Sequence, residues 1–95
     1  MTEPSIRIYE RLSDGTLEDR QEDYDLESFA GQMPCIGDMI VVPGVLQGLD
    51  RSDYRNREVW TVVGRVFNPR DLKGYVALIV EERRPTTQEQ SVVAG

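Results

Sequence analysis

Apolar residues in the second half of the chain fall into three short runs separated by polar or turn-forming residues. The runs are MIVVPGVL (39–46), VWTVVGRVF (59–67) and YVALIVEER (75–83), and they are rich in β-branched and aromatic side chains. Runs of this length and composition, bounded by Gly, Pro, Asn and Asp, are typical of β-strands. The pattern therefore predicts three strands, with a long polar loop at 48–58 between the first and the second.

The N-terminal residues predict a β-hairpin. Residues 5–12 alternate apolar and polar side chains, and Asp14-Gly15 is a strong signal for a two-residue turn. A helix over 16–27 is the alternative, because the segment offers a helix cap and an acidic first turn. Its apolar residues form a poor stripe at helical spacing, so the hairpin is favoured. The two-residue turn sets the facing pairs Leu12 and Leu17, Arg11 and Glu18, and Arg7 and Glu22.

Both faces of the last two predicted strands carry apolar side chains. An antiparallel sheet with one face in water should alternate apolar with polar residues, so a cover over the second face is expected. The cover is either the connector 24–36 of the same chain, or a partner protein or second copy of the chain. Gly64 in mid-strand predicts a bulge or a sharp bend. The second face, and with it the contact of the expected homodimer, consists of Val63, Phe67, Tyr75, Ala77 and Ile79.

These elements predict one mostly β domain over residues 1–85. The expected architecture is a single small antiparallel barrel or a strongly bent sheet of four or five strands. Residues 86–95 have no apolar periodicity and are expected to form a disordered C-terminal tail. The predicted core consists of Ile40, Trp60, Val62, Val66, Leu78 and Val80.

Charge is distributed unevenly along the chain. Residues 1–30 contain nine acidic residues and three arginines, which accounts for the whole net charge of −6, whereas residues 31–95 contain eight acidic and eight basic residues. Non-specific binding to DNA needs a basic surface, so an acidic domain with a pI near 4.5 is a poor candidate for it. The acidic half is expected to keep the protein in solution or to face a basic partner.

The sequence carries no signal for a membrane or for secretion. No apolar run approaches about 18 residues, the length that a membrane-spanning helix needs. The first residues lack the basic and then apolar pattern of a signal peptide. Cys35 is the only cysteine, so no internal disulfide framework is expected. A cytoplasmic protein without membrane contact is therefore expected.

Little of the usual chemistry of enzymes is present. The chain has no histidine and one cysteine, which excludes metal sites built on nitrogen and sulfur ligands. The acidic run 18–27 lacks the glycine and the bidentate glutamate of a calcium loop, and Cys35 has no histidine base to activate it. A pair of carboxylates could act as general acid and base. The seventeen acidic residues are scattered along the chain, so the sequence does not single out such a pair. No catalytic residue, metal or cofactor is predicted.

The loop 48–58 is the strongest candidate for a recognition site. It combines arginines with a central tyrosine, a composition able to pair with carboxylate or phosphate groups and to stack on a ring. The predicted binding residues are Arg51, Tyr54, Arg55 and Arg57. The alternative is a solvated loop whose arginines pair internally with its aspartates.

A local resemblance supports the barrel. Residues PCIGD (34–38) open an apolar strand, and a Gly-Arg-Val triplet follows at 64–66. This arrangement resembles SH3-like barrels, in which Gly-Asp opens a strand. The resemblance covers about a third of the chain and implies only a small barrel, because no functional residue is carried over from it.

Three functions follow from these observations, in order of preference. The first is a non-enzymatic binding module that recognises a protein partner, acting as a homodimer in one form of the hypothesis. The second is a nucleic-acid-binding module that uses the loop 48–58. The third is a small enzyme with a carboxylate-based site, which needs a pocket with perturbed carboxyl groups.

Overall fold

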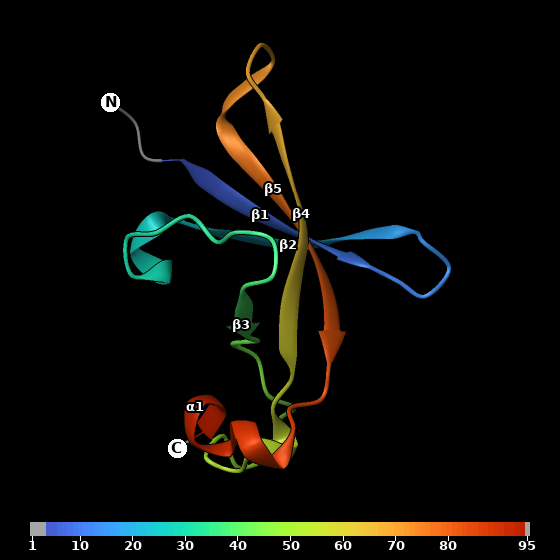
Figure 1. Cartoon of the computed structure of the whole chain (residues 1–95), viewed down its shortest axis with the longest axis vertical. Coiled ribbons are helices and arrows are strands. Elements are labelled where there is room, and N and C mark those ends of the chain that lie inside the picture. Colours follow the sequence, from blue (N-terminus) through green and yellow to red (C-terminus); the bar gives the residue numbers. More distant parts are fainter. Residues whose placement is uncertain (1–3, 95) are drawn as a thin grey trace.

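Five β-strands form one sheet that curls into a half-barrel (Figure 1). The computed structural model describes residues 4–94. The strands lie in the order β2-β1-β5-β4-β3 across the sheet. The predicted mostly β fold with a single strongly bent sheet is confirmed. The strand bounds are β1 (Ser5–Arg11), β2 (Leu17–Tyr24), β3 (Met39–Val41), β4 (Val59–Asn68) and β5 (Leu72–Arg83).

One pair of neighbouring strands runs parallel. β1 lies beside β5 in the middle of the sheet, with Ile6 opposite Val76 and Ile8 opposite Leu78. The other three pairs are antiparallel. The expectation of an antiparallel sheet is therefore wrong for this pair. Its direction is not fixed by a tight turn, because a long stretch of chain connects the two strands.

The predicted hairpin of residues 5–24 is confirmed, but its register differs from the prediction. The turn has three residues, because the Leu12 N–H donates to the Thr16 carbonyl (2.8 Å) around Gly15 at φ 87°. Arg11 therefore faces Leu17. A bulge in β2, where Gln21 has φ 57°, then shifts the pairing the other way. Beyond the bulge the structure pairs Arg7 with Asp23 in place of Glu22.

The three strands predicted in the second half of the chain are present. β3 is shorter than the predicted run 39–46, because Pro43 cannot donate a backbone hydrogen bond to the sheet. β4 and β5 are longer than predicted and join through a tight turn at 69–71. The Asn68 side chain accepts a hydrogen bond from the Asp71 N–H (3.1 Å) and stabilises this turn.

Gly64 marks a bulge in β4, as predicted. Val62 faces Val80, and the next pair is Gly64 with Ile79, so Val63 is an extra residue in the strand. The bulge reverses the alternation of side chains beyond it. Val66, which was predicted to lie in the core, is therefore 51% exposed and lies opposite Ala77.

The core lies on the inner side of the curled sheet. Of the predicted core residues, Trp60, Val62, Leu78 and Val80 are buried and Ile40 packs against them, whereas Val66 is not in the core. The bulge explains the error at Val66, because an unbroken strand would have pointed this side chain inward. The core cluster consists of Ile6, Ile8, Val42, Trp60, Val62, Val76, Leu78 and Val80.

The connector 24–36 covers the inner face of the sheet. It contains a 3-10 helix (Leu26–Phe29), whose first residue follows Asp25, and the Asp25 carboxylate accepts a hydrogen bond from the Ser28 N–H (3.0 Å). Apolar side chains of the connector pack against the core, with the rings of Tyr24 and Phe29 in edge contact at 5.6 Å. A connector lying over the second apolar face was one of the two expected arrangements. The structure places the connector on the inner face instead.

The C-terminal residues differ from the disorder expected over 86–95. They form a 3-10 helix (Thr87–Glu89) and the short helix α1 (Gln90–Ala94), while residue 95 lies outside the described part of the chain. Glu89 forms an ion pair with Arg83 of β5 (2.7 Å), and Val93 is buried. The segment lies next to the 3-10 helix Tyr54–Asn56 of the loop 48–58, at the lower end of the molecule in Figure 1.

Candidate functional site

The outer face of the sheet, turned away from the core, carries apolar and aromatic side chains in the middle strands. Tyr75 and Val66 are about half exposed, at 47% and 51%. β1 and β5 place their residues on this face by their parallel register, which sets Arg7 beside Ala77 and Tyr9 beside Ile79. The residues that define the outer face are Arg7, Tyr9, Val66, Tyr75, Ala77 and Ile79.

The bulge in β4 changes which residues belong to this face. The predicted homodimer contact comprised Val63, Phe67, Tyr75, Ala77 and Ile79. Beyond the bulge, Phe67 is opposite Val76, whose side chain points to the core, so Phe67 lies on the inner side. Val66 takes its place on the outer face. Gly64 is also on this side, because a Cβ built there would lie 3.4 Å from the Ile79 side chain.

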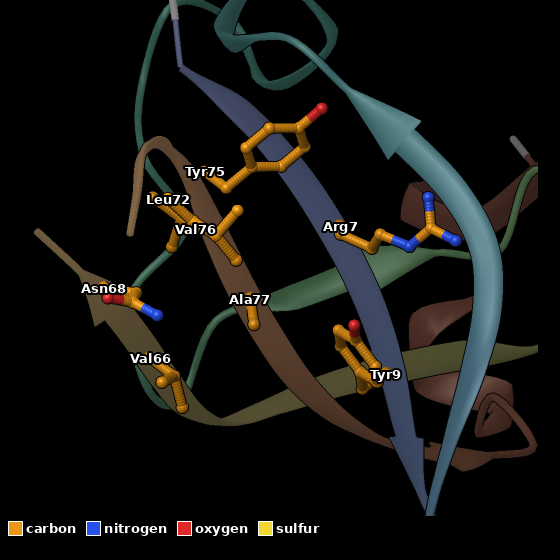
Figure 2. Close-up of a pocket in the computed structure, with 8 residues that line it drawn as sticks. All are labelled: Arg7, Tyr9, Val66, Asn68, Leu72, Tyr75, Val76 and Ala77. Carbon is orange, nitrogen blue, oxygen red and sulfur yellow. The ribbon is translucent and has the colours of Figure 1, made fainter. Parts of the chain in front are cut away.

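A shallow hollow of about 270 Å³ lies on the outer face near the β4–β5 turn. Figure 2 shows Tyr75 and Ala77 on β5 between Val66 on β4 and the side chains of Arg7 and Tyr9 on β1. The volume is slightly below the roughly 300–1,000 Å³ that is common for small-molecule pockets. An open, mostly apolar hollow of this size fits one or two side chains of a protein better than a whole metabolite.

Arg7 forms a fixed polar edge beside the apolar residues. Its guanidinium donates to both carboxylate oxygens of Asp19 and contacts Asp23 at 3.1 Å. The hydrogen bond from Arg7, assisted by one from the Gln21 N–H, lowers the pKa of Asp19 below its ordinary value. The two carboxylates neutralise Arg7 and hold its planar group in one orientation. Such an ordered polar group beside aromatic rings is typical of protein interfaces.

The tip of the β4–β5 hairpin, residues 65–75, exposes further apolar side chains. Figure 1 shows this hairpin projecting beyond the rest of the sheet. Phe67 and Leu72 are 56% and 53% exposed. The Arg65 guanidinium lies 5.6 Å from the centre of the Phe67 ring, within the range of a cation–π contact. Exposed apolar groups gathered in one place mark interaction surfaces on soluble proteins.

The structure does not bring the four predicted loop residues into one exposed cluster. Arg57 is buried, and its guanidinium donates to the carbonyls of Arg51 (3.2 Å) and Val42 (3.1 Å). Arg57 therefore holds the loop 48–58 together from inside. The signal for this role, an arginine two residues before the strand that begins at Val59, is too common to have been recognised in the sequence.

The other predicted loop residues lie at the surface in different surroundings. Arg55 forms a two-point ion pair with Asp53, and this hydrogen bond lowers the pKa of Asp53 to about 2. The Tyr54 hydroxyl lies 3.5 Å from the Thr87 hydroxyl of the C-terminal segment. Arg51 is exposed. The predicted binding role of the loop stays a prediction, and the internal Arg–Asp pairing of its alternative is present.

A cluster of carboxylates and arginines lies on the inner side of the sheet, around a hollow of about 600 Å³ that residues of the loop 48–58 also line. Partial burial raises the pKa of Glu82 above its ordinary value, and the charges of Glu10 and Glu58 raise it further. Arg20 pairs with Glu10 at 3.2 Å. A carboxyl group with a raised pKa is a candidate proton donor, so a carboxylate-based enzyme site would lie here.

The described residues offer little for a metal or a membrane. Among residues 4–94, no three Cys, Asp or Glu side chains come together as metal ligands. Cys35 is a free, exposed thiol. In the same part of the chain, no helix is both long enough and apolar enough to cross a membrane.

Comparison with known proteins identifies no relative: no family model, no curated protein and no solved structure matches this chain.

Proposed function

We propose that this chain is a non-enzymatic protein-binding module and that its interface is the outer face of the sheet. The observation that carries the proposal is the exposure of Val66 and Tyr75 beside Tyr9, around an open apolar hollow. Buried interface centres favour tyrosine and arginine, and both are present here. The single free thiol of Cys35 suits a reducing compartment, and a cytoplasmic protein is part of the same proposal.

Protein is favoured over nucleic acid because of the charges around the outer face. Asp19 and Asp23 form ion pairs with Arg7, the arginine that lines the hollow. Phosphate groups of a nucleic acid would be repelled by these carboxylates, since affinity for nucleic acids depends on free cationic groups. In the loop 48–58, the burial of Arg57 and the pairing of Arg55 with Asp53 reduce the charge available to phosphate. Protein partners do not need such free charge.

A photo-crosslinking amino acid placed at single positions tests the proposal. It is introduced at Tyr75 of the outer face or at Arg51 of the loop 48–58, and the protein is irradiated in its native cells. We expect protein crosslinks from position 75 that disappear when Val66 is replaced by lysine, because a charge in the apolar hollow opposes docking. Equal crosslinking from both positions, or crosslinks that Val66→Lys leaves unchanged, would contradict the outer-face interface. Nucleic acid captured at position 51 would support the alternative function.

A further inference from the structure

One edge of β4 lacks a strand partner along the hairpin. Within residues 4–94, β3 pairs with β4 only as far as Thr61. At Val62, the carbonyl accepts a hydrogen bond from the Gly37 N–H, and the Val62 N–H donates to the Asp38 carbonyl. From Gly64 to Asn68 the edge is open. Pro69 has no backbone N–H and ends the stretch able to pair. An unpaired edge with exposed apolar side chains is a template for another strand.

We infer that this open edge, residues 64–68, pairs with the same edge of a second copy of the chain in an antiparallel, two-fold symmetric dimer centred on Val66. The inference rests on the proposed protein-binding function and names the partner as a second copy. The outer faces of the two copies then join across the new strand pair. Half-exposed Val66 of each copy becomes covered at the centre of the joined surface.

The residues along the edge select this register. Opposite residues in an antiparallel pair point to the same side of the sheet, whereas neighbouring residues along one strand point to opposite sides. The two-fold axis must therefore lie between the two copies of one residue, so that this residue faces its own copy. With the axis at Val66, Arg65 of one copy lies opposite Phe67 of the second copy. The Arg65 side chain already lies over the Phe67 ring of its own chain at 5.6 Å, so the dimer gives each cation a second aromatic neighbour.

The neighbouring registers are less favourable. An axis at Arg65 would set two arginines directly opposite each other, and like charges in this position destabilise a strand pair. An axis at Phe67 would place Arg65 opposite Pro69 of the second copy, where no N–H is available for the ladder. Gly64, paired with Asn68 in the register centred on Val66, offers no steric obstacle. The edge is therefore complementary to itself in one register.

The rival arrangement joins different edges of two copies. The other edge of the sheet is β2, which carries four acidic residues between Leu17 and Tyr24, whereas the hairpin tip carries Arg65, Arg70 and Lys73. Pairing of β2 with the β4 edge of the next copy is favoured by charge. It does not close on itself at two copies, and it produces longer chains that dissociate in high salt.

Disulfide crosslinking in a Cys35→Ser background tests the register. Residues directly opposite across an antiparallel pair have Cβ atoms about 4.5–5.5 Å apart, close to the roughly 3.5–4.5 Å of a disulfide. We expect Val66→Cys to form a crosslinked dimer in oxidised glutathione. The matched control Leu72→Cys, equally exposed on the same hairpin, should not. Arg65→Cys mixed with Phe67→Cys should crosslink, whereas Arg65→Cys alone should not.

Sedimentation equilibrium of the unmodified chain completes the test. We expect a dimer that Val66→Lys converts to a monomer with unchanged Trp60 fluorescence, which shows that the variant is folded. A dimer in which Arg65→Cys alone crosslinks overturns the register. Growing chains that dissociate in salt overturn the two-fold pairing in favour of β2. A monomer at high micromolar concentration overturns the second copy as partner, while crosslinks from position 75 to another protein would leave the proposed function standing.

Discussion

Replacement of Leu78 by alanine should destabilise the fold more than a matched replacement at the surface. Leu78 is fully buried at the centre of the core, opposite Ile8 of β1. The change removes three buried carbon atoms, worth about 2.4 kcal/mol at roughly 0.8 kcal/mol for each. The cavity left behind raises the total to about 3–4 kcal/mol. Leu72→Ala removes the same atoms from a side chain that is 53% exposed and should cost under about 0.5 kcal/mol.

Urea denaturation followed by the fluorescence of Trp60 measures both variants. Trp60 is the single tryptophan and is fully buried, so its emission reports loss of the core. All proteins are compared at one concentration, because dimer formation would add a concentration-dependent term. A chain of this size loses about 4–8 °C in melting temperature for each kcal/mol. A loss below about 1.5 kcal/mol for Leu78→Ala, or an equal loss for Leu72→Ala, would refute the assignment of the inner face.

Two further predictions concern the C-terminal segment and the ion pair between Arg7 and Asp19. Truncation after Pro85 removes the buried Val93 and should lower the melting temperature by several degrees. This corresponds to a loss of about 1 kcal/mol in the free energy of unfolding, once the entropy cost of ordering the segment is subtracted. An unchanged melting curve would show that the segment does not dock, as the sequence pattern indicated. Asp19→Asn should lower the urea midpoint near neutral pH, and the difference from the unmodified chain should shrink as the pH falls below about 4. The ion pair with Arg7 lowers the pKa of Asp19 in the folded state, so its stabilisation is present above the unfolded pKa and is lost on acidification; a difference that stays constant with pH would contradict this origin.

The sequence predicted the strands well but not their phase. Strand positions depend on local composition, and the runs around Trp60 and Leu78 carry a strong β signal. The phase of β4 depends on which residue of the bulge is left unpaired. Gly64 indicated that a bulge was present, yet the extra residue is its neighbour Val63. A shift of one residue moves every later side chain to the other face, and for this reason Val66 and Phe67 were exchanged.

The candidate site was harder to predict because it depends on distant parts of the chain. The sequence indicated a second apolar face, but its cover depends on which side of the sheet the connector crosses. Tyr24 and Phe29 pack on the inner side, and no local pattern shows this choice. The loop 48–58 presents the reverse case, since its arginines look equivalent in the sequence. The structure buries Arg57 and leaves Arg51 exposed.

The parallel pairing of β1 with β5 has a consequence for how the chain folds during synthesis. Arg11 and Glu81, an ion pair between these strands, are 70 residues apart in the sequence. During synthesis β1 therefore stays without its β5 partner until residues 72–83 have left the ribosome, and until then β1 can pair only with β2 in the hairpin. An isolated hairpin is marginally stable in water, and contacts between distant residues slow folding because a long loop must close first. Until β5 arrives, Ile6 and Ile8 stay exposed, so chaperones and aggregation compete for the N-terminal strand in the nascent chain.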